Sequence, residues 1–154
     1  MPSTTLIEDF LAQDHIAFVG VSRNPKEFAN AVYRSMRDAG RTLYPVNTDA
    51  GGVPIEGDPS YRSLADVPDP VDGVVVMVPA DRAVEVVRDA VARGVPRVWL
   101  HRGLGRGAVS EDAVELCRVH GIAVVDGACP LRFDGDVGGA HRLHRFFIRG
   151  RFAA

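Results

Sequence analysis

An unbroken apolar run in the middle of the chain constrains the fold more than any other feature. Residues 71–79 read VDGVVVMVP, with three consecutive valines inside the run. A continuous β-branched run of this kind is typical of a strand that is buried on both faces. Strands of that type occur in parallel sheets, where a helical crossover connects each strand to the next. The run therefore predicts an α/β fold.

Strand and helix patterns alternate along the rest of the chain. Helices are expected over residues 4–13, 26–39, 80–94 and 110–121, and strands over 15–21, 42–46, 71–79, 97–101 and 122–126. This order predicts a Rossmann-like, doubly wound, mainly parallel sheet with helices on both faces. With 154 residues the chain fits one domain over 1–154.

Several local features refine these elements. In the helix of 26–39, Phe28, Val32 and Met36 are expected to face inward, and Gly40 ends it. Ser110 is the expected N-cap of the helix over 110–121. Residues 51–70 are rich in turn formers and predict one short strand and one helical turn.

Composition excludes several classes of protein. The formal net charge is −2, so no nucleic-acid partner is expected. No segment is apolar enough to span a membrane, and the first residues lack the basic region of a secretory leader. Two cysteines do not form a disulfide framework, so a reducing cytoplasm is the expected location.

The loop after the first strand, GVSRNPK over 20–26, resembles a nucleotide-binding turn that keeps only its first glycine. Gly20 allows the tight bend, whereas Ser22 and Pro25 stand where a dinucleotide fold has glycine. The Ser22 hydroxyl can donate to a phosphate oxygen. Arg23 and Lys26, the only lysine, add positive charge near a helix N-terminus that already favours an anion.

A structural interpretation of the same loop stays open. Asn24 could be the helix N-cap, with Pro25 at the first helical position and Glu27 completing a capping box. The loop would then be a well-capped turn without a ligand.

The end of the second strand narrows the choice of nucleotide. NAD-binding folds usually place an acidic residue there to hold the ribose hydroxyls. Here the strand ends in Pro45-Val46-Asn47-Thr48, and the first carboxylate is Asp49. A ligand with phosphate and adenine that is not a standard NAD is therefore favoured.

An ordered set of motifs resembles one family. The segments GVSRNPKEF, NAVYRSM, YPVN, SLADVPDPVDGVVVMVP, VWLHRG and GACP occur in that order. Together they resemble the small stand-alone CoA-binding proteins, which are related to the nucleotide-binding domain of succinyl-CoA synthetase alpha chains. The resemblance implies a Rossmann-like domain that binds coenzyme A. It implies that the diphosphate lies on Gly20, Val21, Ser22 and Arg23, and that the adenosine reaches Asn47, Val78 and Pro79. Asn24, Pro25 and Lys26 of the same loop complete the expected binding site.

Three classes of function remain, and the first is preferred over the other two. The first is non-catalytic binding of CoA or an acyl-CoA, as a carrier, sensor or subunit, with no catalytic residue. The second is an enzyme acting on CoA thioesters, or an accessory subunit of such an enzyme. The third is an NAD(P)-binding redox protein, which the missing acidic residue argues against. No nucleophile–base pair and no metal motif stands out, so no reaction of the chain alone is expected.

Each of the remaining reactive residues can be interpreted either as structural or as functional. Cys129 could form a mixed disulfide with a CoA thiol, but packing in the core is favoured, as it is for Cys117 and Trp99. His141 and His144 could share a helix face, and a metal pair there would need further ligands. A basic amphipathic helix over about 139–150 is the preferred alternative. It could pack on the domain itself or on a second subunit, and the latter would make a homodimer.

Overall fold

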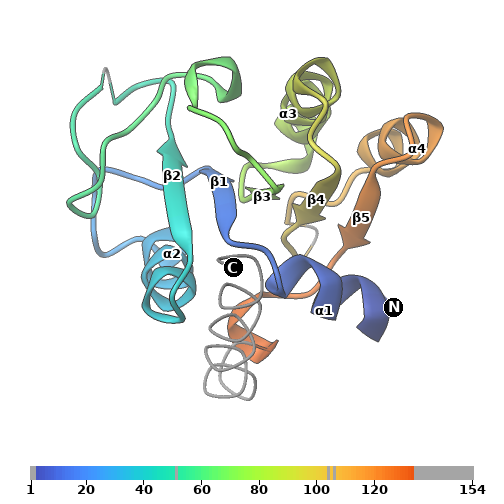
Figure 1. Cartoon of the computed structure of the whole chain (residues 1–154), viewed down its shortest axis with the longest axis horizontal. Coiled ribbons are helices and arrows are strands. Elements are labelled where there is room, and N and C mark those ends of the chain that lie inside the picture. Colours follow the sequence, from blue (N-terminus) through green and yellow to red (C-terminus); the bar gives the residue numbers. More distant parts are fainter. Residues whose placement is uncertain (1–2, 51, 104, 106, 134–154) are drawn as a thin grey trace, which may run out of the picture.

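Five parallel strands form the centre of this protein in a computed structural model, which describes residues 3–50, 52–103, 105 and 107–133 (Figure 1). The strands are β1 (His15–Val19), β2 (Thr42–Val46), β3 (Gly73–Val76), β4 (Arg97–Leu100) and β5 (Ala123–Asp126). Their order across the sheet is β2-β1-β3-β4-β5, and every neighbouring pair is parallel. The predicted parallel α/β sheet is confirmed.

Helices cover both faces of the sheet, as the sequence predicted. They are α1 (Thr4–Leu11), α2 (Phe28–Asp38), α3 (Ala80–Arg93) and α4 (Glu111–Val119), with a short 3-10 helix η1 (Leu64–Asp66). Alternation along β3 divides the core: Val74 and Val76 pack with α3 and α4, whereas Val75 packs with α1 and α2 (Figure 1). All three valines are fully buried, as expected for a central strand.

Register brings three strand ends to one edge of the sheet. Val19, the last residue of β1, lies opposite Val46 of β2 and Val76 of β3. The loops that follow these strands therefore leave from the same edge. β2 and β3 flank β1 on opposite sides, so the order of strands switches here, which is where open α/β sheets bind ligands.

The start of α2 differs from the sequence prediction. The helix was expected from residue 26, but it begins at Phe28, with Glu27 at the N-cap position in an extended conformation. Asn24 is therefore not its N-cap and Glu27 completes no capping box. Instead the Asn24 side chain accepts a hydrogen bond from the Lys26 backbone at 3.1 Å, which closes a separate turn before the helix.

Phe28 was expected to face the core, and that prediction is wrong. Val32 and Met36 are fully buried, but Phe28 is 54% exposed. Phe28 is the first residue of α2, and the buried residues Val32 and Met36 belong to later turns of the helix. The Phe28 ring lies 6.0 Å from the ring of His101, which follows β4.

The turn-rich region is only partly as expected. Its helical turn is η1, but in the described part of 51–70 the expected strand is reduced to two isolated bridges, Val46 with Tyr61 and Ile55 with Asp58. The Ser110 N-cap is confirmed, since its hydroxyl accepts from the Ala113 backbone at 3.3 Å. The helix expected over about 139–150, with His141 and His144, lies outside the described residues.

Candidate functional site

Gly20 fixes the path of the chain as it leaves β1. Its backbone N–H donates to the carbonyl of Val46 at 3.3 Å, and its φ of +112° is a conformation that side chains disfavour. A Cβ at this position would lie 2.7 Å from the carbonyl carbon of Met77 and closer still to its oxygen. The glycine is therefore required both by conformation and by the close approach of β3.

Two asparagine side chains hold the next two residues. The buried Asn30 of α2 accepts from the Ser22 backbone N–H at 2.9 Å and donates to the Ser22 carbonyl at 2.7 Å. Asn47, just after β2, donates to the Val21 carbonyl at 2.8 Å. We call residues 20–22, which these partners hold in place, the clamped loop. Its backbone is set before any ligand arrives, which lowers the cost of ordering it on binding.

The following residues, 23–27, form an exposed turn that is built differently. The Ser22 hydroxyl accepts from the Asn24 backbone at 3.0 Å, and Glu27 N–H donates to the Asn24 carbonyl at 3.1 Å. Arg23 and Lys26 are exposed. Within the described residues neither side chain has an ion-pair partner. Both cations can therefore approach an anion beside the clamped loop.

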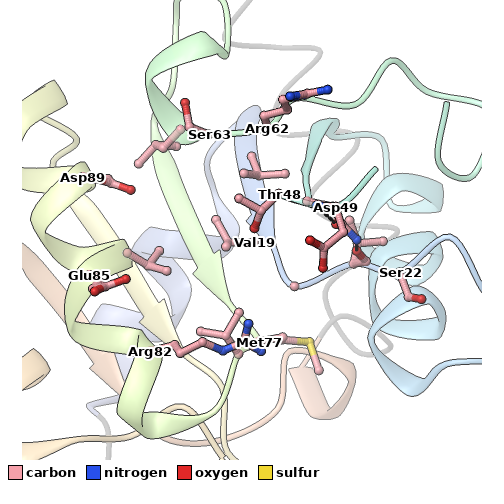
Figure 2. A pocket seen from close by; sticks show the side chains of 17 residues that line it. Val19, Ser22, Thr48, Asp49, Arg62, Ser63, Met77, Arg82, Glu85 and Asp89 are labelled. Carbon is pink, nitrogen blue, oxygen red and sulfur yellow. Dashed lines mark hydrogen bonds between the residues drawn. The ribbon is translucent and has the colours of Figure 1, made fainter. Parts of the chain in front are cut away.

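A cavity of about 320 Å³ opens beside the clamped loop (Figure 2). The ends of β1, β2 and β3 form one wall and α3 forms the other. Figure 2 shows Ser22, Thr48 and Asp49 on the strand side, facing Arg82, Glu85 and Asp89 of α3. This size is at the lower end of the range for small-molecule sites, so the cavity suits a part of a large ligand.

Charges of both signs line the cavity. Arg62 and Arg82 provide positive charge, and Figure 2 shows Arg82 extending from the first turn of α3 toward Met77. Asp49, Glu85 and Asp89 provide negative charge. Partial burial and the nearby Glu85 raise the pKa of Asp89 above its ordinary value. Cations and hydrogen-bonding groups in one cavity fit a ligand that has both phosphate and hydroxyl or amino groups.

The residues expected to contact a ligand fall into two groups. Five line the cavity: Gly20, Val21, Ser22, Asn47 and Val78. The other five lie next to it in exposed positions, namely Arg23, Asn24, Pro25 and Lys26 in the exposed turn and Pro79 at the N-cap of α3. The side chain of Asn47 is already engaged, because it donates to Val21 and its oxygen accepts from the Asp49 backbone at 2.8 Å.

Sequence reasoning missed several residues that line the cavity, both on α3 and in the turn-rich region. Arg62 and Ser63 belong to the turn-rich region, where no periodicity marks a residue as facing inward. Arg82 sits in the first turn of a helix that follows a strand end. Since such turns adjoin the ligand edge of a parallel sheet, its position was a usable signal.

Neither of the two cysteines, Cys117 and Cys129, is suited to redox chemistry. Cys129 is 7% exposed and packs in the core with Trp99, which confirms the expected packing. Burial raises its pKa above the ordinary value, and burial raises the pKa of Cys117 to about 11. Both thiols therefore stay protonated near neutral pH, and the thiol form is a poor nucleophile.

His101 lies beyond the β3 side of this edge and is nearly buried. Its Nε2 has no hydrogen-bond partner among the described residues, and burial lowers the pKa of the ring. Within the same residues no group of three or more His, Cys, Asp or Glu side chains could hold a metal ion. A search of the described helices for one long and apolar enough to cross a membrane found none.

A parallel α/β sheet with a polar cavity at its switch point is typical of the class of Rossmann-like proteins that bind a ligand at this edge. Comparison with known families is more specific, since the model of the CoA binding domain matches residues 14–133. The chain belongs to this CoA-binding family.

Two curated relatives show where such domains occur. The chain is 28% identical over 120 residues to the alpha subunit of an ADP-forming acetate–CoA ligase I of Pyrococcus furiosus, a match that covers 71% of this chain and 26% of the subunit. It thus spans about a quarter of that ligase subunit. It is 29% identical over 132 residues to the uncharacterized protein YneT of Bacillus subtilis, covering 83% of this chain and 91% of YneT.

Solved structures agree with the fold. A hypothetical protein from Pyrococcus horikoshii OT3 superposes with a TM-score of 0.76 at 27% identity, covering 84% of this chain and 88% of the other. A dinucleotide-forming acetyl-coenzyme A synthetase 1 of Ca. Korarchaeum cryptofilum, in complex with phosphate and ADP, gives a TM-score of 0.65 at 27% identity. That match covers 77% of this chain and 26% of the synthetase.

Proposed function

We propose that this chain binds coenzyme A or an acyl-CoA without transforming it, as a carrier, sensor or subunit. The observation that supports this most is the position of the cavity, which opens directly onto the clamped loop at the switch point of a CoA-binding family fold. In this proposal the ligand diphosphate lies against Gly20, Val21 and Ser22. The adenosine end occupies the cavity near Asn47 and Val78.

Charge around the loop supports the same ligand. Arg23 and Lys26 stand on the exposed turn at one side of the loop, and Arg82 stands in the cavity on the other. CoA bears both a diphosphate and a further phosphate on its ribose, so it can use cations at two places. In the proposal, Asn24, Pro25 and Pro79 shape the rim of the site.

A role inside a larger enzyme is the second candidate. It is favoured by the similarity to the alpha subunit of an ADP-forming acetate–CoA ligase, of which this chain spans about a quarter. As an accessory subunit, the chain would hold CoA while a partner supplies the reacting groups. For both candidate functions, a cytoplasmic location and a homodimer stay predictions.

Thermal unfolding with added ligands tests the proposal. A ligand at 100 times its dissociation constant stabilises the folded state by about 2.7 kcal/mol, which a melting curve detects. We expect CoA and acetyl-CoA to raise the melting temperature more than NAD or NADP at equal concentration. A larger shift with NAD would favour the redox alternative, with Asp49 holding the ribose, and would refute CoA as the ligand.

A further inference from the structure

A tight turn at residues 55–58 is distant from the clamped loop in the sequence but is connected to it through Asn30 of α2. Residues 55–58 close a two-residue turn in which Ile55 and Asp58 exchange backbone hydrogen bonds, both 2.9 Å long. The two central residues, Glu56 and Gly57, have φ values of 52° and 81°. Turns of this left-handed type favour asparagine or glycine at the first central position. Glutamate there is conformationally costly, so a function of its side chain would account for it.

The Glu56 side chain reaches two residues of α2, Asn30 and Arg34. Its Oε1 accepts from Arg34 at 2.7 Å and from the side-chain amide of Asn30 at 3.0 Å. The carboxylate is only 10% exposed and Asn30 is 1% exposed. A charged group this well covered strengthens the hydrogen bonds that it accepts.

This contact favours the same orientation of the Asn30 amide as the two bonds to the Ser22 backbone. An ionised carboxylate can only accept hydrogen bonds, so the NH₂ group of Asn30 must face Glu56. One amide hydrogen serves Glu56 and the other serves the Ser22 carbonyl, which leaves the Asn30 oxygen for the Ser22 N–H. A flipped amide would lose all three contacts. Glu56 therefore reinforces the orientation that fastens both backbone groups of Ser22.

The bonds to Asn30 determine which groups of Ser22 face the protein and which can face a ligand. The Ser22 N–H points into the protein toward Asn30, so its hydroxyl is the Ser22 donor left for a ligand. We propose that Glu56 is a positioning residue that acts through Asn30 to fix the phosphate-facing side of the clamped loop. This inference rests on the proposed function, because its ligand is the CoA diphosphate.

Replacement of Glu56 by glycine tests the inference without straining the turn. Glycine suits the left-handed conformation, so Glu56→Gly is expected to fold while it removes the carboxylate. We expect the dissociation constant for CoA, measured by calorimetry, to rise roughly tenfold, comparable with the loss of one hydrogen bond to a charged group. In the ligand-free protein, hydrogen exchange at the Ser22 amide should become faster. Glu56→Gln, which keeps the size but can donate as well as accept, should show the same changes to a smaller extent.

Asp58→Asn is the matched control, because Asp58 lies in the same turn and bonds Tyr33 and Arg37 but not Asn30. It should leave CoA affinity and Ser22 exchange near the wild-type values. Asn30→Ala should weaken CoA binding as Glu56→Gly does, and the double variant should be no weaker than Asn30→Ala alone.

The outcomes separate this inference from the proposed function. Unchanged affinity and unchanged Ser22 exchange in Glu56→Gly would overturn the positioning role while wild-type CoA binding stands. An equal loss in Asp58→Asn would also overturn it, since the turn would then act only through stability. A wild-type chain that binds no CoA would overturn the proposed function and the positioning role for a ligand together.

Discussion

The two halves of the segment between β1 and α2 are held in different ways. The clamped loop, residues 20–22, is fastened from outside itself by Val46, Asn30 and Asn47. The exposed turn, residues 23–27, has two bonds among its own residues, one to the Ser22 hydroxyl and one from Arg34 to the Pro25 carbonyl. It presents Arg23 and Lys26 to solvent. The first half sets geometry and the second supplies charge. Substitutions in the first should therefore affect folding and binding together, and substitutions in the second should affect binding alone.

The largest effect is expected where the clamped loop begins. Gly20→Ala forces a side chain into a left-handed conformation and against the Met77 carbonyl, so it should lower the free energy of unfolding by about 3 kcal/mol or more. Chemical denaturation measures this change. Gly94→Ala is the control for conformation alone, since Gly94 also has positive φ but nothing lies within 4 Å of its Cβ position. It should cost about 1–2 kcal/mol. Equal losses in the two variants would show that the close approach of β3 is unimportant.

Asn47→Ala should have the next largest effect. It removes the donor to the Val21 carbonyl and the acceptor for the Asp49 N–H, at a cost of about 1–3 kcal/mol. CoA affinity should also fall, because Val21 is no longer fastened. Thr48→Ala, an exposed neighbour on the cavity wall, should change stability by no more than about 0.5 kcal/mol. If Asn47→Ala weakens CoA binding without loss of stability, Asn47 contacts the ligand directly instead of holding the loop.

The exposed turn should show the opposite pattern. Arg23→Ala and Lys26→Ala should each weaken CoA binding about tenfold through loss of a charge-assisted hydrogen bond. Stability should stay within about 0.5 kcal/mol of the wild type. Calorimetry and denaturation on the same samples give both values. Arg88→Ala, which removes an exposed cation elsewhere on α3, controls for net charge. If all three variants bind CoA equally well, the turn is no part of the site.

The smallest effect concerns pH and lies outside both halves. Burial lowers the pKa of His101 below its ordinary value of 6.5, so the unfolded chain takes up a proton there first as pH falls. Its contribution to stability is full above about pH 6.5 and is lost below it. Melting temperatures at about pH 7.5 and about pH 5.5 should therefore differ more for the wild type than for His101→Gln. His120→Gln, at the exposed end of α4, should retain the wild-type difference. An equal difference in all three proteins would refute a buried neutral His101.

The sequence was sufficient for the fold, but only five of the 17 residues that line the cavity were among the expected binding residues. The run at Val74–Val76 and the cap at Ser110 are local patterns, and local patterns determine which elements form and in what order. The clamp is not local, since Asn30 is eight residues from Ser22 and Glu56 is 26 residues from Asn30. A polar residue on a helix reveals its partner only after the chain has folded. The burial of Phe28 was wrongly predicted for a related reason. Helical spacing shows which face of a helix is apolar, but it does not show which of its turns the rest of the protein covers.

The central claim is that CoA binds at the clamped loop and the cavity beside it. A titration of ¹⁵N-labelled protein with CoA, followed by amide chemical shifts, tests this claim most directly. We expect the amides of Gly20 to Ser22, those next to Asn47 and that of Arg82 to shift and saturate together. Amides at the opposite edge of the sheet, such as that of His15, should stay in place. Saturable shifts confined to that opposite edge, or no shifts at all, would contradict the account.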